Sequence, residues 1–321
     1  MKKYFWLFIM VGMISGLSSC TPDEKQENEV VIGFSQLGNE STWRERNTAS
    51  IKEAAKKANY KLLFANGQQK QSKQIKDIRS FIASRVDVIV LSPIVETGWE
   101  NVLTEARDAG IPVILNDRDI QIEDTSLYQT LVGTDSTAQG RKAGDFLKKK
   151  FEGTSEQIQI VEITGTPGSS STENRSLGFR DSLNMEKRFE IVESQNADYM
   201  LSKGKQAMEK LYQQKQLTNV DVIFSHNDDM TLGIVEFLET TSIKPGKDVT
   251  IVSVDAQQEA IHLLKAGKIN CTVECNPNTG PKLMSTITHL LNGGKLEPCY
   301  YLQEQVFSEF SNLSAIPERG Y

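Results

Sequence analysis

The fold is decided by the stretch VVIGFSQLGNESTWRERNTASIKEAAKKANYKLLF (residues 30–64), which runs from one apolar segment through a helical pattern to a second apolar segment. Residues 30–34 and 61–64 are short apolar runs of the kind that parallel strands buried on both faces require. Residues 42–58 between them have helical spacing. A strand, a helix and a second strand at this spacing predict a right-handed βαβ unit.

The same alternation continues along the chain in two series. The first series adds expected strands at 86–91 and 112–115 and expected helices at 71–84 and 98–109. The second series has expected strands at 158–163, 189–194, 221–225 and 250–254, and expected helices at 173–183, 202–214, 231–240 and 257–266. One core seldom serves a chain of about 300 residues. The pattern therefore predicts an α/β fold of two doubly wound parallel-sheet lobes joined by a hinge.

The first residues indicate export. Lys2 and Lys3 precede a short apolar run that reaches Cys20 through Leu-Ser-Ser, so residues 1–19 read as a secretory signal. The run is too short for a spanning helix. Leu-Ser-Ser-Cys resembles the bacterial lipobox, which implies lipidation of Cys20; the alternative is an ordinary signal with a coincidental cysteine. Residues 20–29 read as a polar tether. We expect a chain held at the periplasmic or outer face of the cell membrane by its lipid alone.

Composition excludes several classes of function. Cleavage after residue 19 removes two of the 36 basic residues and leaves 34 against 42 acidic ones, a net charge of −8, which argues against nucleic-acid binding. No dinucleotide, phosphate-loop or nucleophile-elbow motif is present. We expect no cofactor, no metal and no catalytic residue. Cys271, Cys275 and Cys299 are expected as three reduced thiols, with a bridge from Cys299 to one of the others as the alternative.

Polar residues follow several of the expected strands directly. They are Ser35 and Gln36, Asp117 and Arg118, Asn227, and Asp255. In doubly wound sheets, ligands bind outside the carboxyl ends of the strands. These positions are therefore candidates for a binding site.

The segment Gly33–Arg44 resembles the first strand and ligand loop of the periplasmic sugar-binding proteins of the ribose-binding type. Further matches occur in the same order at 66–71, 92–99, 117–118, 225–230, 244–248 and 276–281. Within the family the chain is most similar to the galactofuranose-binding group that serves ABC importers. The resemblance covers roughly residues 30–292 and is weak from about Lys295 onward. It implies lobe one at 30–135 plus 277–305, lobe two at 136–276, and a C-terminal tail at 306–321.

The resemblance also implies a set of sugar contacts. Asp117 and Arg118 would clamp hydroxyl groups, and Trp43 would cover the apolar face of the ring, unless the pair is a surface ion pair and Trp43 only packs its own lobe. The second lobe would supply Arg175, Tyr199, Asn227, Asp255 and Glu274, with Arg180 as the alternative to Arg175. Glu40 and Arg44 either reach the sugar or brace the loop. Asp135, Asp228 and Asp229 are expected as helix caps.

The implied function is capture of one galactofuranose-like sugar between the lobes by a monomer that delivers it to an ABC importer permease. A sugar sensor for a membrane signalling kinase is the alternative. A glycosidase is disfavoured because Arg118 should lower the pKa of Asp117 and make it a poor general acid.

Overall fold

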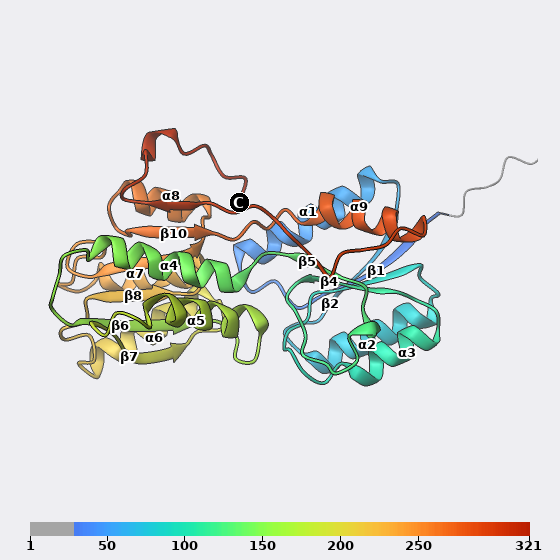
Figure 1. The fold of residues 1–321 in the computed structure, drawn as a ribbon, viewed down its shortest axis with the longest axis horizontal. Coiled ribbons are helices and arrows are strands. Elements are labelled where there is room, and N and C mark those ends of the chain that lie inside the picture. Colours follow the sequence, from blue (N-terminus) through green and yellow to red (C-terminus); the bar gives the residue numbers. More distant parts are fainter. Residues whose placement is uncertain (1–28) are drawn as a thin grey trace, which may run out of the picture.

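The computed structural model describes residues 29–321, which form two similar lobes side by side (Figure 1). The expected signal at 1–19, Cys20 and all of the expected tether except Glu29 lie outside the described residues. None of the helices between residues 29 and 321 combines the length and the apolar character that crossing a bilayer requires.

The first lobe is built on a six-stranded parallel sheet with the order β11-β5-β4-β3-β1-β2. Its strands are β1 (Val31–Gln36), β2 (Lys61–Asn66), β3 (Val88–Leu91), β4 (Val113–Asp117), β5 (Leu131–Gly133) and β11 (Cys299–Tyr301). Its helices are α1 (Thr42–Lys57), α2 (Gln71–Ala83), α3 (Glu100–Asp108) and α9 (Gly280–Leu291). Alternate strand residues pack under α1 and α9 on one face and under α2 and α3 on the other.

The second lobe repeats this plan with the strand order β12-β10-β9-β8-β6-β7. Its strands are β6 (Ile158–Thr164), β7 (Phe189–Asn196), β8 (Val222–Ser225), β9 (Thr250–Asp255), β10 (Cys271–Glu274) and β12 (Val306–Ser308). Its helices are α4 (Ser136–Lys150), α5 (Ser170–Leu183), α6 (Leu201–Gln213), α7 (Asp228–Leu238) and α8 (Gln258–Lys265). Because both sheets have helices on both faces and all their strands are parallel except β12 at the edge of the second sheet, the predicted fold class is confirmed.

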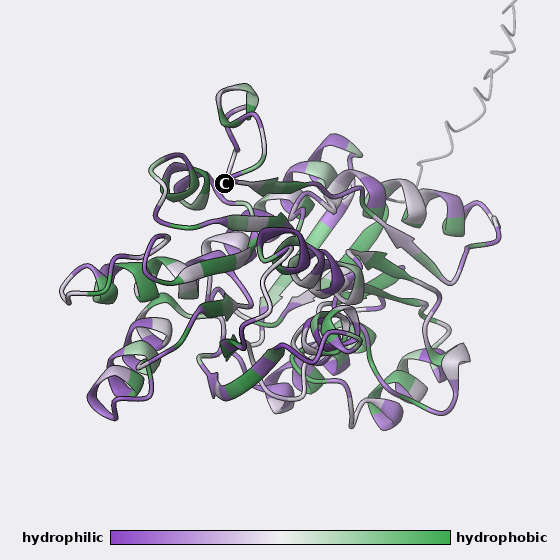
Figure 2. Ribbon diagram, turned by 60° about the vertical axis from the view of Figure 1, so that its left-hand side comes forward, coloured by the Kyte–Doolittle hydropathy of each residue, from purple (hydrophilic) through white to green (hydrophobic). Residues whose placement is uncertain are grey.

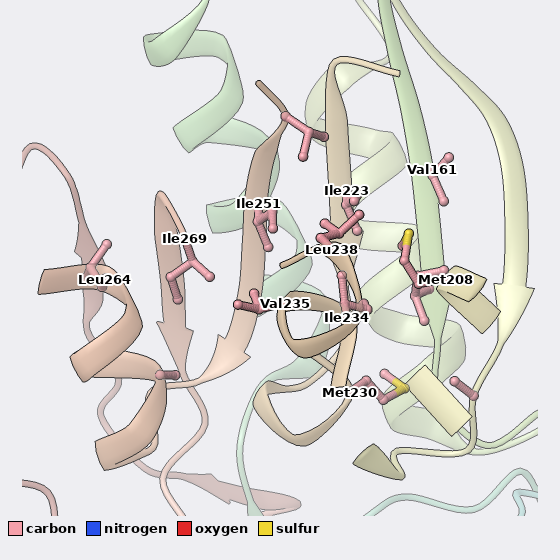
Figure 3. Close-up of a cluster of buried hydrophobic side chains, with 14 of the residues drawn as sticks. Val161, Met208, Ile223, Met230, Ile234, Val235, Leu238, Ile251, Leu264 and Ile269 are labelled. Atoms are coloured by element: carbon pink, nitrogen blue, oxygen red, sulfur yellow. The ribbon is translucent and has the colours of Figure 1, made fainter. Parts of the chain in front are cut away.

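Each face of each sheet has its own apolar core. Figure 3 shows the core under α6, α7 and α8, where Met230, Ile234 and Leu238 of α7 share one buried cluster with Ile223 and Ile251 of the sheet. The apolar colouring is concentrated on the central strands and the polar colouring on loops and outward turns (Figure 2). This burial on both faces explains why the strands are continuous apolar runs.

The chain passes between the lobes after β5, after β10 and after β11. The last passage leads into β12, which pairs antiparallel with β10. Residues 306–321, expected as a tail, thus add a strand to the second sheet. Among the described residues all three cysteines are free thiols.

Candidate functional site: a closed cavity between the lobes

A small cavity lies where the carboxyl ends of the strands in the two lobes meet. It is lined by Glu40, Ser41, Trp43, Arg44, Asp117, Arg118, Ser171, Arg175, Tyr199, Asn227, Asp255 and Cys275. The space between these side chains is narrow in this conformation. The lining side chains are buried, which means that the lobes are closed around the cavity.

Nine of the twelve residues predicted as contacts line this cavity. They are Glu40, Trp43, Arg44, Asp117, Arg118, Arg175, Tyr199, Asn227 and Asp255. The structure places the other three, Ser35, Gln36 and Glu274, outside it.

Each of these three has other partners. The Ser35 hydroxyl donates to Asp77 at 3.4 Å inside lobe one. The Gln36 amide donates to Asn47 at 3.1 Å and accepts from Arg44 at 3.4 Å, so it braces a lining residue from behind. Glu274 accepts from the Gln305 backbone at 2.9 Å and is ion-paired with Arg319.

Arg44 joins two carboxylates of lobe one. Its guanidinium lies 3.1 Å from Glu40 Oε1 and 2.8 Å from Asp117 Oδ2. Burial alone would lower the pKa of Arg44, but Asp117 and Glu40 raise it above its ordinary value. Arg44 is therefore a fixed cation that holds both acids in place.

Arg118 is the second cation of lobe one. Its Nη1 donates to the Ile94 carbonyl at 3.2 Å, and its Nε lies 4.0 Å from Asp117 Oδ2. Burial, together with the neighbouring Arg44, lowers the pKa of Arg118.

Three buried polar atoms of these residues have no hydrogen-bond partner among the described residues. They are Glu40 Oε2, Asp117 Oδ2 and Arg118 Nε. Asp117 Oδ2 is also ion-paired with Arg44 at 2.8 Å. Buried polar groups are normally paired, so two acceptors and one donor are available to a ligand.

Lobe two supplies a matching pair. Arg175 on α5 donates to Gln139 at 2.8 Å and to the His226 carbonyl at 2.6 Å, and its Nη2 lies 4.0 Å from Asp255 Oδ1. Burial raises the pKa of Asp255 well above its ordinary value, and Arg175 opposes that shift. Arg180, the alternative to Arg175, is bound to Glu162 instead.

Two aromatic rings complete the cavity. The Trp43 indole N–H donates to the Cys275 carbonyl at 2.6 Å, so a side chain of α1 reaches the end of β10. The guanidinium carbons of Arg118 and Arg175 lie 5.2 and 5.7 Å from the centre of the Tyr199 ring. These rings are fixed between charged groups and can cover apolar C–H surface of a ligand.

Three lining residues have backbone angles that side chains rarely adopt. The φ angles are 69° at Asp117, 63° at Tyr199 and 126° at Asp255. Such conformations persist only where the surrounding structure enforces them, and they cluster at functional sites. Here they turn side chains from strand ends and loops toward the cavity.

Hydrogen bonds join the lobes around the cavity. The Glu96 N–H donates to the Gly168 carbonyl at 2.9 Å, and the Asp119 N–H donates to the Ser170 hydroxyl at 2.8 Å. Asp229 accepts from Thr42. The two lobes are therefore in direct contact on several sides of the cavity.

The sequence did not single out Ser41, Ser171 and Cys275 as lining residues. Ser41 caps α1, and Ser171 lies in the first turn of α5, so both occupy ordinary positions at a helix start. Asp135 caps α4 and Asn227 caps α7, while Asp228 and Asp229 form the first turn of α7. No group of three or more candidate metal ligands comes together within residues 29–321.

Comparison with known proteins identifies relatives of this chain. The family described as Periplasmic binding protein domain matches residues 32–295. The galactofuranose-binding protein YtfQ of Escherichia coli (strain K12) is 39% identical over 271 residues, which cover 84% of this chain and 85% of that protein.

Two solved structures share the fold and contain furanoses. A Mycobacterium smegmatis protein in complex with β-D-fucofuranose has a TM-score of 0.84 and 41% identity, covering 87% of this chain and 91% of that one. The periplasmic binding protein component of the arabinose ABC transporter from Shewanella sp. ANA-3, bound to α- and β-L-arabinofuranose, has a TM-score of 0.83 and 38% identity, covering 87% and 92%.

Proposed function

This chain belongs to the family of periplasmic binding protein domains, and on that premise we propose that it captures one monosaccharide in its five-membered-ring form between its lobes. The observation that carries the proposal is the set of hydrogen-bonding groups around the cavity. Three guanidinium groups (Arg44, Arg118, Arg175) and three carboxyl groups (Glu40, Asp117, Asp255) line it. Donors and acceptors gathered in this way suit a ligand that carries several hydroxyl groups.

The unpaired atoms fit sugar hydroxyls. A hydroxyl both donates and accepts, so it can donate to Asp117 Oδ2 or Glu40 Oε2 and accept from Arg118 Nε, the atoms that lack partners. Trp43 and Tyr199 can cover the C–H faces of a ring.

The furanose preference is supported by the relatives. Galactofuranose, fucofuranose and arabinofuranose appear in the names of proteins 38 to 41% identical to this chain. The narrow space between the lining side chains favours one ring over a disaccharide.

Calorimetry against D-galactose, L-arabinose, D-fucose, ribose and glucose tests the assignment. We expect one sugar per chain, with the bound ring form identified as furanose by NMR of the ¹³C-labelled sugar. Failure to bind any of these sugars, or binding of the pyranose ring, would contradict the proposal.

We propose that the protein binds its sugar without transforming it. The support is that the family and the relatives that this chain matches are named as binding proteins. Aryl furanosides should remain intact after prolonged incubation with the protein, whereas steady release of the aryl alcohol would indicate a glycosidase.

We further propose that the chain is exported, anchored through the lipidated Cys20, monomeric, and coupled to an ABC importer. The importer role is supported by the ABC transporter named for the Shewanella relative. Changing Cys20→Ser should release the protein from membranes while sugar binding persists. Neighbouring permease and ATPase genes would support uptake, and a neighbouring sensor kinase gene would support signalling instead.

A further inference from the structure

The last residues of the chain return to the binding cavity from behind. After β12, residues 313–321 run back over the second lobe, with Leu313 and Ile316 packed on the core of Figure 3 and Tyr321 packed on the core under α4 and α5. The Tyr321 carbonyl accepts from the Gln258 N–H at 2.7 Å, and the Arg319 N–H donates to Gln258 Oε1 at 2.6 Å. The segment is thus fixed to the first turn of α8.

Tyr321 reaches the backbone of a lining residue. Its hydroxyl donates to the Asp255 carbonyl at 3.3 Å, which also accepts from the Cys275 N–H at 3.3 Å. The Tyr321 hydroxyl in turn accepts from Arg319 Nη2 at 2.5 Å. This series of hydrogen bonds runs from Arg319 through Tyr321 and ends at the carbonyl of Asp255, whose side chain faces the cavity.

That backbone needs support from its surroundings. Asp255 and the next residue, Ala256, have consecutive positive φ angles of 126° and 60°, although neither is glycine. Positions of this kind are costly unless neighbouring groups enforce them. The Ala256 N–H donates to Thr272 at 3.1 Å and the Gln257 N–H to Asp228 at 2.7 Å, which leaves the Asp255 carbonyl to Cys275 and Tyr321.

The same segment explains where Glu274 points. Glu274 is ion-paired with Arg319, and the side chains are only 8% and 11% exposed. Arg319 lies with its guanidinium carbon 5.2 Å from the centre of the Phe307 ring and 5.2 Å from that of Tyr321. The carboxylate at the end of β10 therefore holds the C-terminal segment and does not face the cavity.

From these contacts we infer that Tyr321, oriented by Arg319 and Glu274, is a positioning residue that sets the direction of the Asp255 carboxyl toward the bound sugar. The part of this inference that concerns sugar affinity rests on the proposed function. Its structural part, the support of residues 255–257, does not depend on any ligand.

The test compares Tyr321→Phe with Tyr212→Phe, the same change at a half-exposed tyrosine of α6. In the ligand-free protein, Tyr321→Phe should speed amide hydrogen exchange at residues 255–257 by roughly tenfold while the urea midpoint stays near that of the wild type. Exchange there equal to the wild type would overturn the inference whatever the sugar. A lowered midpoint with uniformly faster exchange would assign Tyr321 a merely structural role and would also overturn it.

The second measurement in this test is sugar affinity. One hydrogen bond corresponds to roughly a 3- to 10-fold change, so Tyr321→Phe should weaken sugar binding by that factor and Tyr212→Phe should not. The double variant Glu274→Gln with Arg319→Gln, which leaves no buried charge unpaired, should weaken binding by a similar factor. Wild-type affinity in both Tyr321→Phe and the double variant would overturn the inference. If the wild-type protein binds no sugar, the proposed function alone is contradicted, because the hydrogen-exchange measurement still decides the role of Tyr321.

Discussion

Asp229 of the second lobe accepts two hydrogen bonds from Thr42 of the first, one from the backbone N–H at 3.2 Å and one from the hydroxyl at 3.1 Å. Thr42 is the first residue of α1, where a carboxylate is favoured by the unpaired N–H groups and the dipole of the helix. Asp229 was expected to serve its own helix α7. It instead completes a helix start that belongs to the other lobe, so the contact holds the two lobes together in this conformation.

Asp229→Asn should weaken the closed state. We expect about a 3- to 10-fold faster sugar release in stopped-flow measurements, because the uncharged amide oxygen of asparagine binds the two Thr42 donors less strongly than a carboxylate does, with little change in the association rate. Thr42→Val removes the hydroxyl partner, so the two changes together should cost less than the sum of the single changes. Strict additivity would show that the contact does not act on closure.

Arg118→Met should abolish measurable sugar binding while the fold persists. The Arg118 side chain is 2% exposed and its Nε is the unpaired donor of the cavity. Without it, the ligand oxygen loses its donor, which costs about 1 to 3 kcal/mol, and Asp117 loses a neighbouring positive charge. Arg107→Met, at an exposed arginine of α3, is the control and should bind as the wild type does. Retained affinity in Arg118→Met would exclude Arg118 from the site.

Most of the strand and helix framework could be predicted from the sequence because it depends on local apolar runs. Helix α4 could not, because Gly140 and Gly144 weaken its helical pattern. Those glycines allow α4 and α5 to approach closely: a Cβ on Gly140 would lie 2.1 Å from the Arg175 carbonyl oxygen. The glycines at positions 140 and 144 are thus explained by a tertiary contact between two helices, which local sequence patterns do not reveal.

The candidate site likewise combines residues that local sequence predicts with residues that only the folded structure explains. Residues that follow strands, such as Asp117 and Asp255, line the cavity because strand ends face the other lobe. Glu274 has the same sequence context, but Arg319 binds it. Arg319 belongs to a segment where the family resemblance is weak, and only the folded path of that segment brings it to Glu274.

Gly140→Ala should destabilise the protein and also weaken sugar binding. Alanine is the better helix former by about 1 kcal/mol, so helix propensity alone would raise stability. The clash with the Arg175 carbonyl requires α5 to move, which we expect to cost about 1 to 3 kcal/mol of unfolding free energy. Urea unfolding and calorimetry measure the two effects, and a stabilised variant with unchanged affinity would contradict the argument.

Glu304→Gln should flatten the pH dependence of stability. Glu304 lies on the last passage between the lobes, accepts from Gln139 at 2.9 Å and from the Asn276 N–H at 3.2 Å, and burial raises its pKa from 4.5 to about 7. The folded protein therefore holds a proton that the unfolded chain releases above about pH 4.5.

The contribution of Glu304 to the free energy of unfolding should therefore be greatest below about pH 4.5. It should fall as pH rises to about 7, by at most about 1.4 kcal/mol per pH unit. Asp228, whose pKa burial also raises to about 7, contributes to both proteins. Urea unfolding at pH 5, 6, 7 and 8 measures the difference between wild type and Glu304→Gln. Parallel curves would show that Glu304 ionises normally in the folded protein.

Trp43 should report sugar binding by fluorescence. The sequence has three tryptophans, of which Trp6 lies in the expected signal and Trp99 is fully buried in the core of lobe one, with its N–H bonded to the Val95 carbonyl at 2.8 Å. Trp43 instead lines the cavity, bonds to Cys275 and has the Arg44 guanidinium carbon 4.7 Å from its ring centre.

In mature Trp99→Phe protein, we expect sugar to change the emission of Trp43, because closure by hinge motion removes water from its ring. The reciprocal variant, Trp43→Phe, keeps only the distant Trp99 and should show no change at sugar concentrations that saturate it in calorimetry. A signal that persists in Trp43→Phe and disappears in Trp99→Phe would place the ligand away from this cavity, since the two indoles lie in different environments and only one of them touches the proposed site.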